Sequence, residues 1–156
     1  MMDRFLYSME HNFEKMKTDI NNILNQPTYT EEDKNRIFNS VGCCLHFILD
    51  YAERKTEYLN KDDKEILDAF KYANNGLKHG IEIKEITEHV GGISFPIEFP
   101  LSIPERKIVW NVNWEPKSKN QKAMYKKHLD GVGVIESCEN MIIYLKKISN
   151  EEDGMY

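Results

Sequence analysis

The sequence predicts a mainly α-helical protein, a four-helix bundle with a small antiparallel β-sheet inserted between the third and fourth helices. Over most of the 156 residues, apolar side chains recur at steps of three and four, which places them on one face of a helix. After Gly80 the spacing changes to strict alternation, which is typical of strands. This length fits one domain, so we expect a single domain over residues 1–156 with the β insertion at 81–116.

The first two predicted helices have clear boundaries in the sequence. The first runs from about Met2 to Leu24 and ends before Pro27, because proline cannot occupy a helix interior. The second begins after Thr30, whose hydroxyl can accept from an exposed amide, while Asp33 stands where the reciprocal partner of a capping box belongs. Its apolar pattern continues to about residue 59.

The third predicted helix starts with Asn60 as its cap and ends near Gly80, a residue suited to the position just past a helix. Its first turn carries two aspartates, which the helix dipole favours. The pattern predicts an inner face that includes one polar side chain among apolar ones: Ile66, Leu67, Phe70, Ala73, Asn74 and Leu77.

The β insertion is predicted from a glycine pair, Gly91-Gly92, that lies between two alternating runs and indicates a hairpin. Three prolines restrict the middle of the insertion to an edge strand or an irregular connection. A second strand is expected near its end, where four apolar residues alternate: Ile108, Trp110, Val112 and Trp114. The two tryptophans either form an exposed surface for a partner or pin the sheet onto the helices, and we expect the second.

The last predicted helix runs from about residue 119 to 148, with Gly131 and Gly133 marking a bend or a close helix crossing. Its start is basic, with lysines that could contact phosphates: Lys119, Lys122, Lys126 and Lys127. The alternative is a solvated helix face that acidic segments elsewhere balance, and the sequence favours this interpretation.

Composition limits the classes of function. The formal net charge of −5 argues against a protein whose whole surface holds nucleic acid. Three cysteines without paired spacing predict free thiols, and scattered N-terminal charges without a long apolar run predict a cytoplasmic protein with no membrane contact. There is no CxxC, no HExxH pattern and no glycine-rich phosphate loop, so we expect no metal and no cofactor.

The end of the third helix, YANNGLKHG at residues 72–80, raises the question of a catalytic motif. A helical bundle of this size with Asn-x-x-x-His at a helix end resembles the HEPN superfamily. That resemblance implies a bundle that pairs as a homodimer and, in many members, a metal-independent ribonuclease with an arginine and a histidine four to six residues apart. The best alignment places Asn74 at the arginine, Asn75 at the following polar position and His79 at the histidine.

The motif departs from the family pattern at its arginine. Asparagine has no charge to stabilise a scissile phosphate, although His79 could still transfer protons. An ordinary helix end also explains these residues, because Lys78 and His79 suit the negative end of the helix dipole.

The resemblance therefore implies a noncatalytic binding or regulatory protein, of the kind that serves in phage defence or in toxin–antitoxin pairs. The first alternative is a metal-independent ribonuclease that uses His79 with Lys78 or Lys71 as the cation. The second is a contact inhibitor or an unrelated helical interaction protein. We expect a homodimer with a protein partner, and nucleic acid is a less favoured partner.

Overall fold

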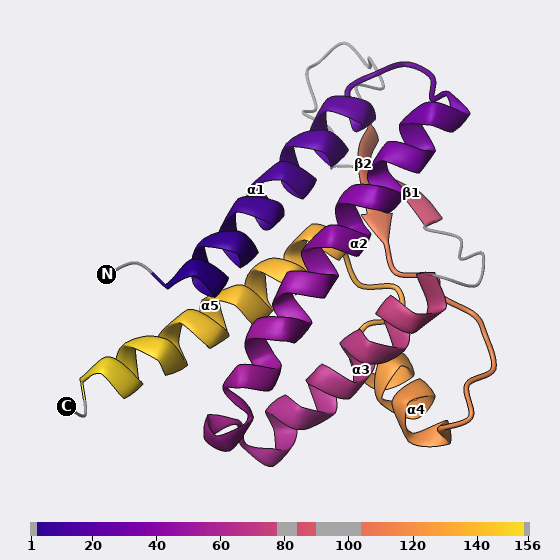
Figure 1. Cartoon of the computed structure of the whole chain (residues 1–156). Coiled ribbons are helices and arrows are strands. Elements are labelled where there is room, and N and C mark those ends of the chain that lie inside the picture. Colours follow the sequence, from indigo (N-terminus) through magenta and orange to yellow (C-terminus); the bar gives the residue numbers. More distant parts are fainter. Residues whose placement is uncertain (1–2, 78–83, 90–103, 155–156) are drawn as a thin grey trace, which may run out of the picture.

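The structure is a computed structural model that describes residues 3–77, 84–89 and 104–154, and these ranges form a helical bundle (Figure 1). Helices α1 and α2 form an antiparallel hairpin, and α5 runs beside them. The helical-bundle prediction is confirmed. The five α-helices of the described ranges are α1 (Arg4–Leu24), α2 (Glu31–Arg54), α3 (Lys61–Leu77), α4 (Lys119–His128) and α5 (Val134–Asp153), with a short 3-10 helix, η1 (Thr56–Tyr58), after α2.

The predicted starts of α2 and α3 are confirmed by their capping contacts. Thr30 Oγ1 accepts from the Asp33 amide and the Asp33 carboxylate accepts from the Thr30 amide, both at 3.0 Å. Asn60 and Asp63 make the same reciprocal pair at 2.9 and 3.2 Å. These four bonds satisfy amides that the helix geometry leaves without intrahelical acceptors.

The single last helix expected over 119–148 is divided in two, which corrects the four-helix count. Helix α4 ends at His128 and α5 begins at Val134. Gly131 has a φ of +76°, a backbone conformation that glycine adopts without steric cost. Its amide donates to the Trp110 carbonyl, and the Trp110 amide donates to the Val132 carbonyl, both at 3.0 Å. The break therefore exchanges helical hydrogen bonds for bonds to a distant segment.

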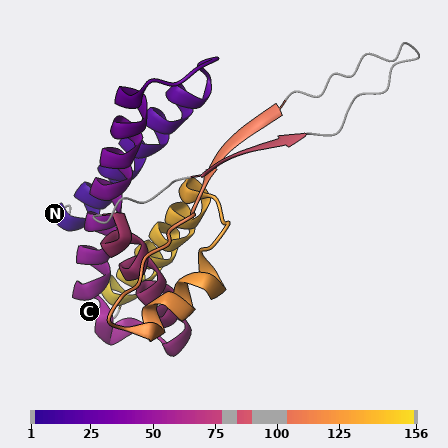
Figure 2. The same cartoon turned by 90° about the vertical axis from the view of Figure 1, so that its right-hand side faces the viewer.

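The β insertion also differs from the prediction. In the described part of the chain it holds one two-stranded antiparallel ribbon, β1 (Lys84–His89) paired with β2 (Pro104–Val109), which projects away from the helices (Figure 2). This narrow ribbon does not bear out the sheet expected over 81–116. The predicted turn at Gly91-Gly92 lies outside the described residues. Residues 110–114, expected in a strand, form no regular ladder because their polar groups bond to the helices instead.

This segment, residues 110–114, is buried among the helices, as the alternation of its tryptophans predicted. Trp110 is 1% exposed and its indole nitrogen donates to Ser137 Oγ at 2.7 Å. Trp114 stacks on Tyr72 with the ring centroids 5.4 Å apart and donates to the Tyr72 carbonyl at 3.2 Å. We conclude that Trp110 belongs to the protein interior and that the half-buried Trp114 ring packs against α3.

No helix in the described ranges is long and apolar enough to cross a membrane. Most buried side chains are apolar and come from all parts of the bundle. The three cysteines carry free thiols, two of them buried, Cys44 and Cys138. Burial of apolar surface along the helices is the main source of stability in such a bundle.

Gly76 allows the closest approach between α3 and the segment 110–114. A Cβ atom added at Gly76 would lie 2.5 Å from Val112 Cγ1 and 2.7 Å from the Trp114 ring. Any larger residue must therefore push the segment away from α3, and overpacking of this kind is destabilising. Gly42, in the middle of α2, has no atom within 4 Å of an added Cβ.

We predict opposite effects for the two glycine-to-alanine substitutions. Gly76→Ala should lower the free energy of unfolding by about 1–3 kcal/mol because the new methyl group collides with Val112 and Trp114. Gly42→Ala should raise it by about 0.5–1 kcal/mol because alanine is the better helix former and meets no neighbour. Urea denaturation followed by circular dichroism measures both. A Gly76→Ala variant as stable as the wild type would contradict the packing described.

Candidate functional site

The first two positions of the sequence motif lie on a shallow depression between α2 and α3. Asn74 and Asn75 are both half-buried in the last turns of α3. The depression measures about 410 Å³ and is lined by both helices: His46, Leu49, Asp50, Glu53, Lys71, Asn74 and Asn75. The structure therefore brings the two asparagines together on one accessible surface.

Asn74 does not occupy the inner face of α3 where its spacing placed it. The buried residues of this turn are Ala73, Gly76 and Leu77, and Gly76 contacts the segment 110–114. Because that segment packs on the side of Gly76, the helix is rotated so that Asn74 points towards α2. The expected burial of Asn74 is wrong for this reason.

The charges around the depression are unlike those of a phosphate site. Asp50 and Glu53 bring two carboxylates to its lining, and Lys71 is the one lysine or arginine among the lining residues. Arg54 pairs with Asp50 of the lining at 3.3 Å. Its guanidinium also lies 3.5 Å from the centre of the Phe5 ring. With Asp50 compensated by Arg54, the depression is left with the opposite charges of Glu53 and Lys71, and it lacks the concentrated positive charge of a phosphate site.

His79 and Lys78 lie outside the described residues, so the geometry between His79 and the asparagines stays a prediction. The described histidine of this surface is His46, which sequence reasoning did not select for it. A signal existed, since His46, Asp50 and Glu53 follow one another at i, i+4 and i+7 and so share one face of α2. That α3 would cover this face was not visible in the sequence.

Ion pairs engage half of the predicted phosphate-binding lysines. Lys122 pairs with Glu115, and this contact raises the pKa of Lys122 and lowers the pKa of Glu115. Lys127 binds Glu65 of α3 at 3.0 Å. Lys119 and Lys126 are exposed on α4. The arrangement agrees with a helix face whose charge is balanced within the protein.

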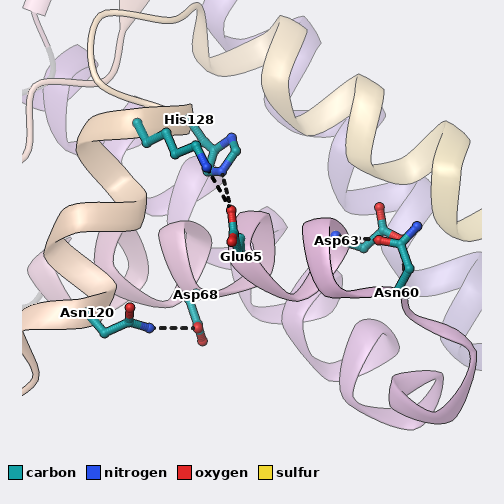
Figure 3. Close-up of polar contacts among 7 residues, drawn as sticks. Asn60, Asp63, Glu65, Asp68, Asn120 and His128 are labelled. Carbon is teal, nitrogen blue, oxygen red and sulfur yellow. Dashed lines mark hydrogen bonds and ion pairs between the residues drawn. The ribbon is translucent and has the colours of Figure 1, made fainter.

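Two acidic side chains of α3, Glu65 and Asp68, contact α4, whereas Asp63 contacts Asn60 at the start of α3 (Figure 3). Asp68 accepts from the Asn120 amide at 3.3 Å, and the ring of His128 lies 3.4 Å from Glu65. Hydrogen bonds from Lys127 and then from His128 lower the pKa of Glu65. Through these contacts α4 is held against α3.

Within the described ranges, no group of three or more His, Cys, Asp or Glu residues is placed to hold a metal ion. Comparison with protein-family models, curated proteins and solved structures finds no match to this chain. A functional conclusion therefore depends on the residues of the depression and on the exposed faces of the helices.

We predict that the Glu65 contacts stabilise the protein in a pH-dependent way. Because the folded-state pKa of Glu65 is lowered, its stabilisation is complete above the ordinary pKa of 4.5 and is lost as the pH falls through the folded value. Glu65→Gln should therefore lower the melting temperature at about pH 7, and the difference from wild type should close at about pH 3. Scanning calorimetry at both pH values measures this.

The control for Glu65→Gln is Glu139→Gln, which removes the same charge from an exposed position on α5. This variant should melt at nearly the wild-type temperature at both pH values. A Glu65→Gln variant whose deficit persisted undiminished at low pH would show that the carboxylate charge is not the stabilising element.

Proposed function

We propose that the protein is a noncatalytic, HEPN-like binding module that regulates a protein partner by contact, in phage defence or in a toxin–antitoxin pair, and that it acts in the cytoplasm. The observation that supports this most is the chemistry at the motif. Asparagine stands at the position of the arginine, and Asp50 and Glu53 face the same depression as Asn74. Arg54 beside this surface is paired with Asp50, and Lys71 is the one lysine or arginine of the lining, so the described part of the surface presents no uncommitted arginine to stabilise a developing phosphate charge.

The same surface is suited to a polar protein contact. Its lining mixes two carboxylates, an ammonium group, two side-chain amides and a histidine. Amides and carboxylates together can accept and donate several hydrogen bonds to a polypeptide, and a basic side chain of a partner would find an acceptor at Glu53. We infer a partner whose contacting segment is basic.

We also propose a homodimer, formed through the surface between α1 and α5. Glu10 of α1 pairs with Lys146 of α5 at 2.5 Å, so the two helices are adjacent there. One turn before each of these residues lies an exposed hydrophobic side chain, Tyr7 at 53% exposure and Ile143 at 60%. A face that carries apolar groups and both signs of charge can be complementary to a second copy of itself related by a two-fold axis.

We predict that Ile143→Asp disrupts this dimer. The substitution replaces an apolar contact by a charged group that must lose its hydration when the interface forms, and it places like charges near one another across the two-fold axis. Sedimentation velocity at tens of micromolar should show the wild type as a dimer and the variant as an 18.4 kDa monomer.

Tyr58→Asp provides the control for the dimer, since it removes another exposed hydrophobic side chain and adds the same charge at η1. It should leave the sedimentation coefficient unchanged. A wild-type protein that is monomeric at this concentration, or an Ile143→Asp variant that remains dimeric, would rule out this interface.

We predict that the purified protein does not cleave RNA in the presence of a metal chelator above the background of a His79→Ala preparation. The physical reason is that a histidine alone transfers protons but does not neutralise the phosphate. Gel analysis of a labelled single-stranded RNA measures cleavage, and circular dichroism checks the fold of the variant. Cleavage that His79→Ala abolishes while the fold persists would instead establish the ribonuclease alternative.

A further inference from the structure

A second hollow, which we call the α3–α5 cavity, lies nearer the start of α3 than the depression does and has a different chemistry. Its volume is about 290 Å³, at the small end of the roughly 300–1,000 Å³ of ligand pockets. Residues of α3, the α4–α5 turn and α5 contribute to its lining, among them Asp63, Phe70, His128, Leu129, Met141 and Tyr144.

Part of the cavity wall is formed by buried apolar side chains. Phe70, Leu129 and Met141 are 1%, 2% and 6% exposed, so their side chains belong to the protein core as well as to the cavity wall. Phe70 packs edge-on against Trp110 with the ring centroids 6.5 Å apart, which fixes its position. Moving the hydrocarbon part of a ligand from water onto such a wall is favourable.

The rim of the cavity carries the carboxylate of Asp63, whose hydrogen-bond donors in the described part of the chain are neutral. Asp63 accepts hydrogen bonds from the Tyr144 hydroxyl and from the Asn60 amide, both of which are neutral donors. Burial, followed by the hydrogen bond to Asp63, raises the pKa of Tyr144 to about 12, so this hydroxyl remains a donor at neutral pH. One oxygen of Asp63, Oδ2, thus links the start of α3 to Tyr144 of α5.

The neighbouring carboxylate on α3 has its counter-charge already. Glu65 is bound by Lys127 at 3.0 Å and by the ring of His128 at 3.4 Å, whereas Asp68 contacts the neutral amide of Asn120 outside the cavity (Figure 3). Of these three acids, Asp63 is the one that lines the cavity. A cation at the rim would therefore pair with Asp63 rather than compete with Lys127.

We propose that the α3–α5 cavity binds a small primary amine with an apolar body of about one ring, with its ammonium group at Asp63 and its hydrocarbon among Phe70, Leu129 and Met141. The ammonium pairs with the Asp63 carboxylate, and the ring contacts the apolar wall in place of water. A neutral analogue loses the charged hydrogen bond and an anionic analogue is repelled. This site is independent of the proposed function, since it shares no residue with the depression or with the α1–α5 surface.

The test is a titration of ¹⁵N-labelled full-length protein with 2-phenylethylamine at neutral pH, followed by amide chemical shifts. We expect saturable shifts confined to the start of α3, the α4–α5 turn and α5. The neutral isostere 2-phenylethanol should bind roughly tenfold more weakly, and phenylacetate more weakly still. Equal affinity for amine and alcohol, shifts elsewhere in the protein, or shifts that do not saturate would each overturn the proposal.

Two carboxylates on the same helix supply matched variants. Asp63→Asn keeps the size of the side chain and an acceptor for the Asn60 amide, and it should weaken the amine roughly tenfold without changing the affinity for 2-phenylethanol. Asp68→Asn removes the same charge five residues away and outside the cavity, so it should change the affinity for the amine less than about twofold. Asp63→Asn binding the amine like the wild type would refute the role of this carboxylate.

A cavity-filling variant keeps the proposal testable should Asp63→Asn disturb the start of α3. Val132 lines the cavity from the α4–α5 turn and is half-buried, so Val132→Phe places a ring where the ligand's ring would lie. This variant should abolish the saturable shifts while its circular dichroism and melting remain cooperative. Undiminished binding of 2-phenylethylamine to folded Val132→Phe would show that the amine binds elsewhere.

Discussion

The segment 110–114 connects three helices at once, and the arrangement of the bundle depends on these contacts. Trp114 and Val112 pack against α3 at Gly76, the Tyr125 hydroxyl of α4 accepts from the Val112 amide at 2.8 Å, and Trp110 donates to Ser137 of α5. Nearly every polar group in this list is buried, so each lost bond would leave an unsatisfied group in the interior. A stretch without regular secondary structure thereby connects α3, α4 and α5 to one another.

Both candidate sites follow from the position that this segment gives to α3. With Gly76 turned towards Trp114, Asn74 and Asn75 face α2, and the two helices form the depression there. The start of the same helix faces α5, where Asp63 and Phe70 line the α3–α5 cavity. A helix placed in this way has a polar site against α2 near its end and a mainly apolar site against α5 nearer its start, and a rotation of α3 would alter both.

Charge balance within the protein decides which surfaces remain available to partners. Contacts with Glu65 and Glu115 engage Lys127 and Lys122, which reduces the positive field of α4. Asp50 is engaged by Arg54, whose guanidinium also covers the Phe5 ring. The charged groups available to a partner therefore differ from those that a count of charges along the chain suggests. They are Glu53 and Lys71 at the depression and Asp63 at the cavity.

Local chemistry in the sequence determined the helical class and the starts of α2 and α3, and it marked Gly131 as a place where the last helix bends or crosses a neighbour closely. These features depend on residues within one helical turn of one another: a cap and its partner three positions on, or a glycine that accepts a positive φ. The sequence also indicated that the motif asparagines lie near the end of a helix, and α3 is regular up to Leu77.

Only the tertiary structure decided what those residues face. The direction of Asn74 depends on Gly76 meeting Trp114, 38 positions later in the chain, and the inclusion of His46 in the depression depends on how α3 lies on α2. The division of the last helix at residues 129–133 was likewise completed by hydrogen bonds to Trp110. Contacts between residues so far apart are set by the packing of whole elements, and no local pattern encodes which side chain will lie opposite which.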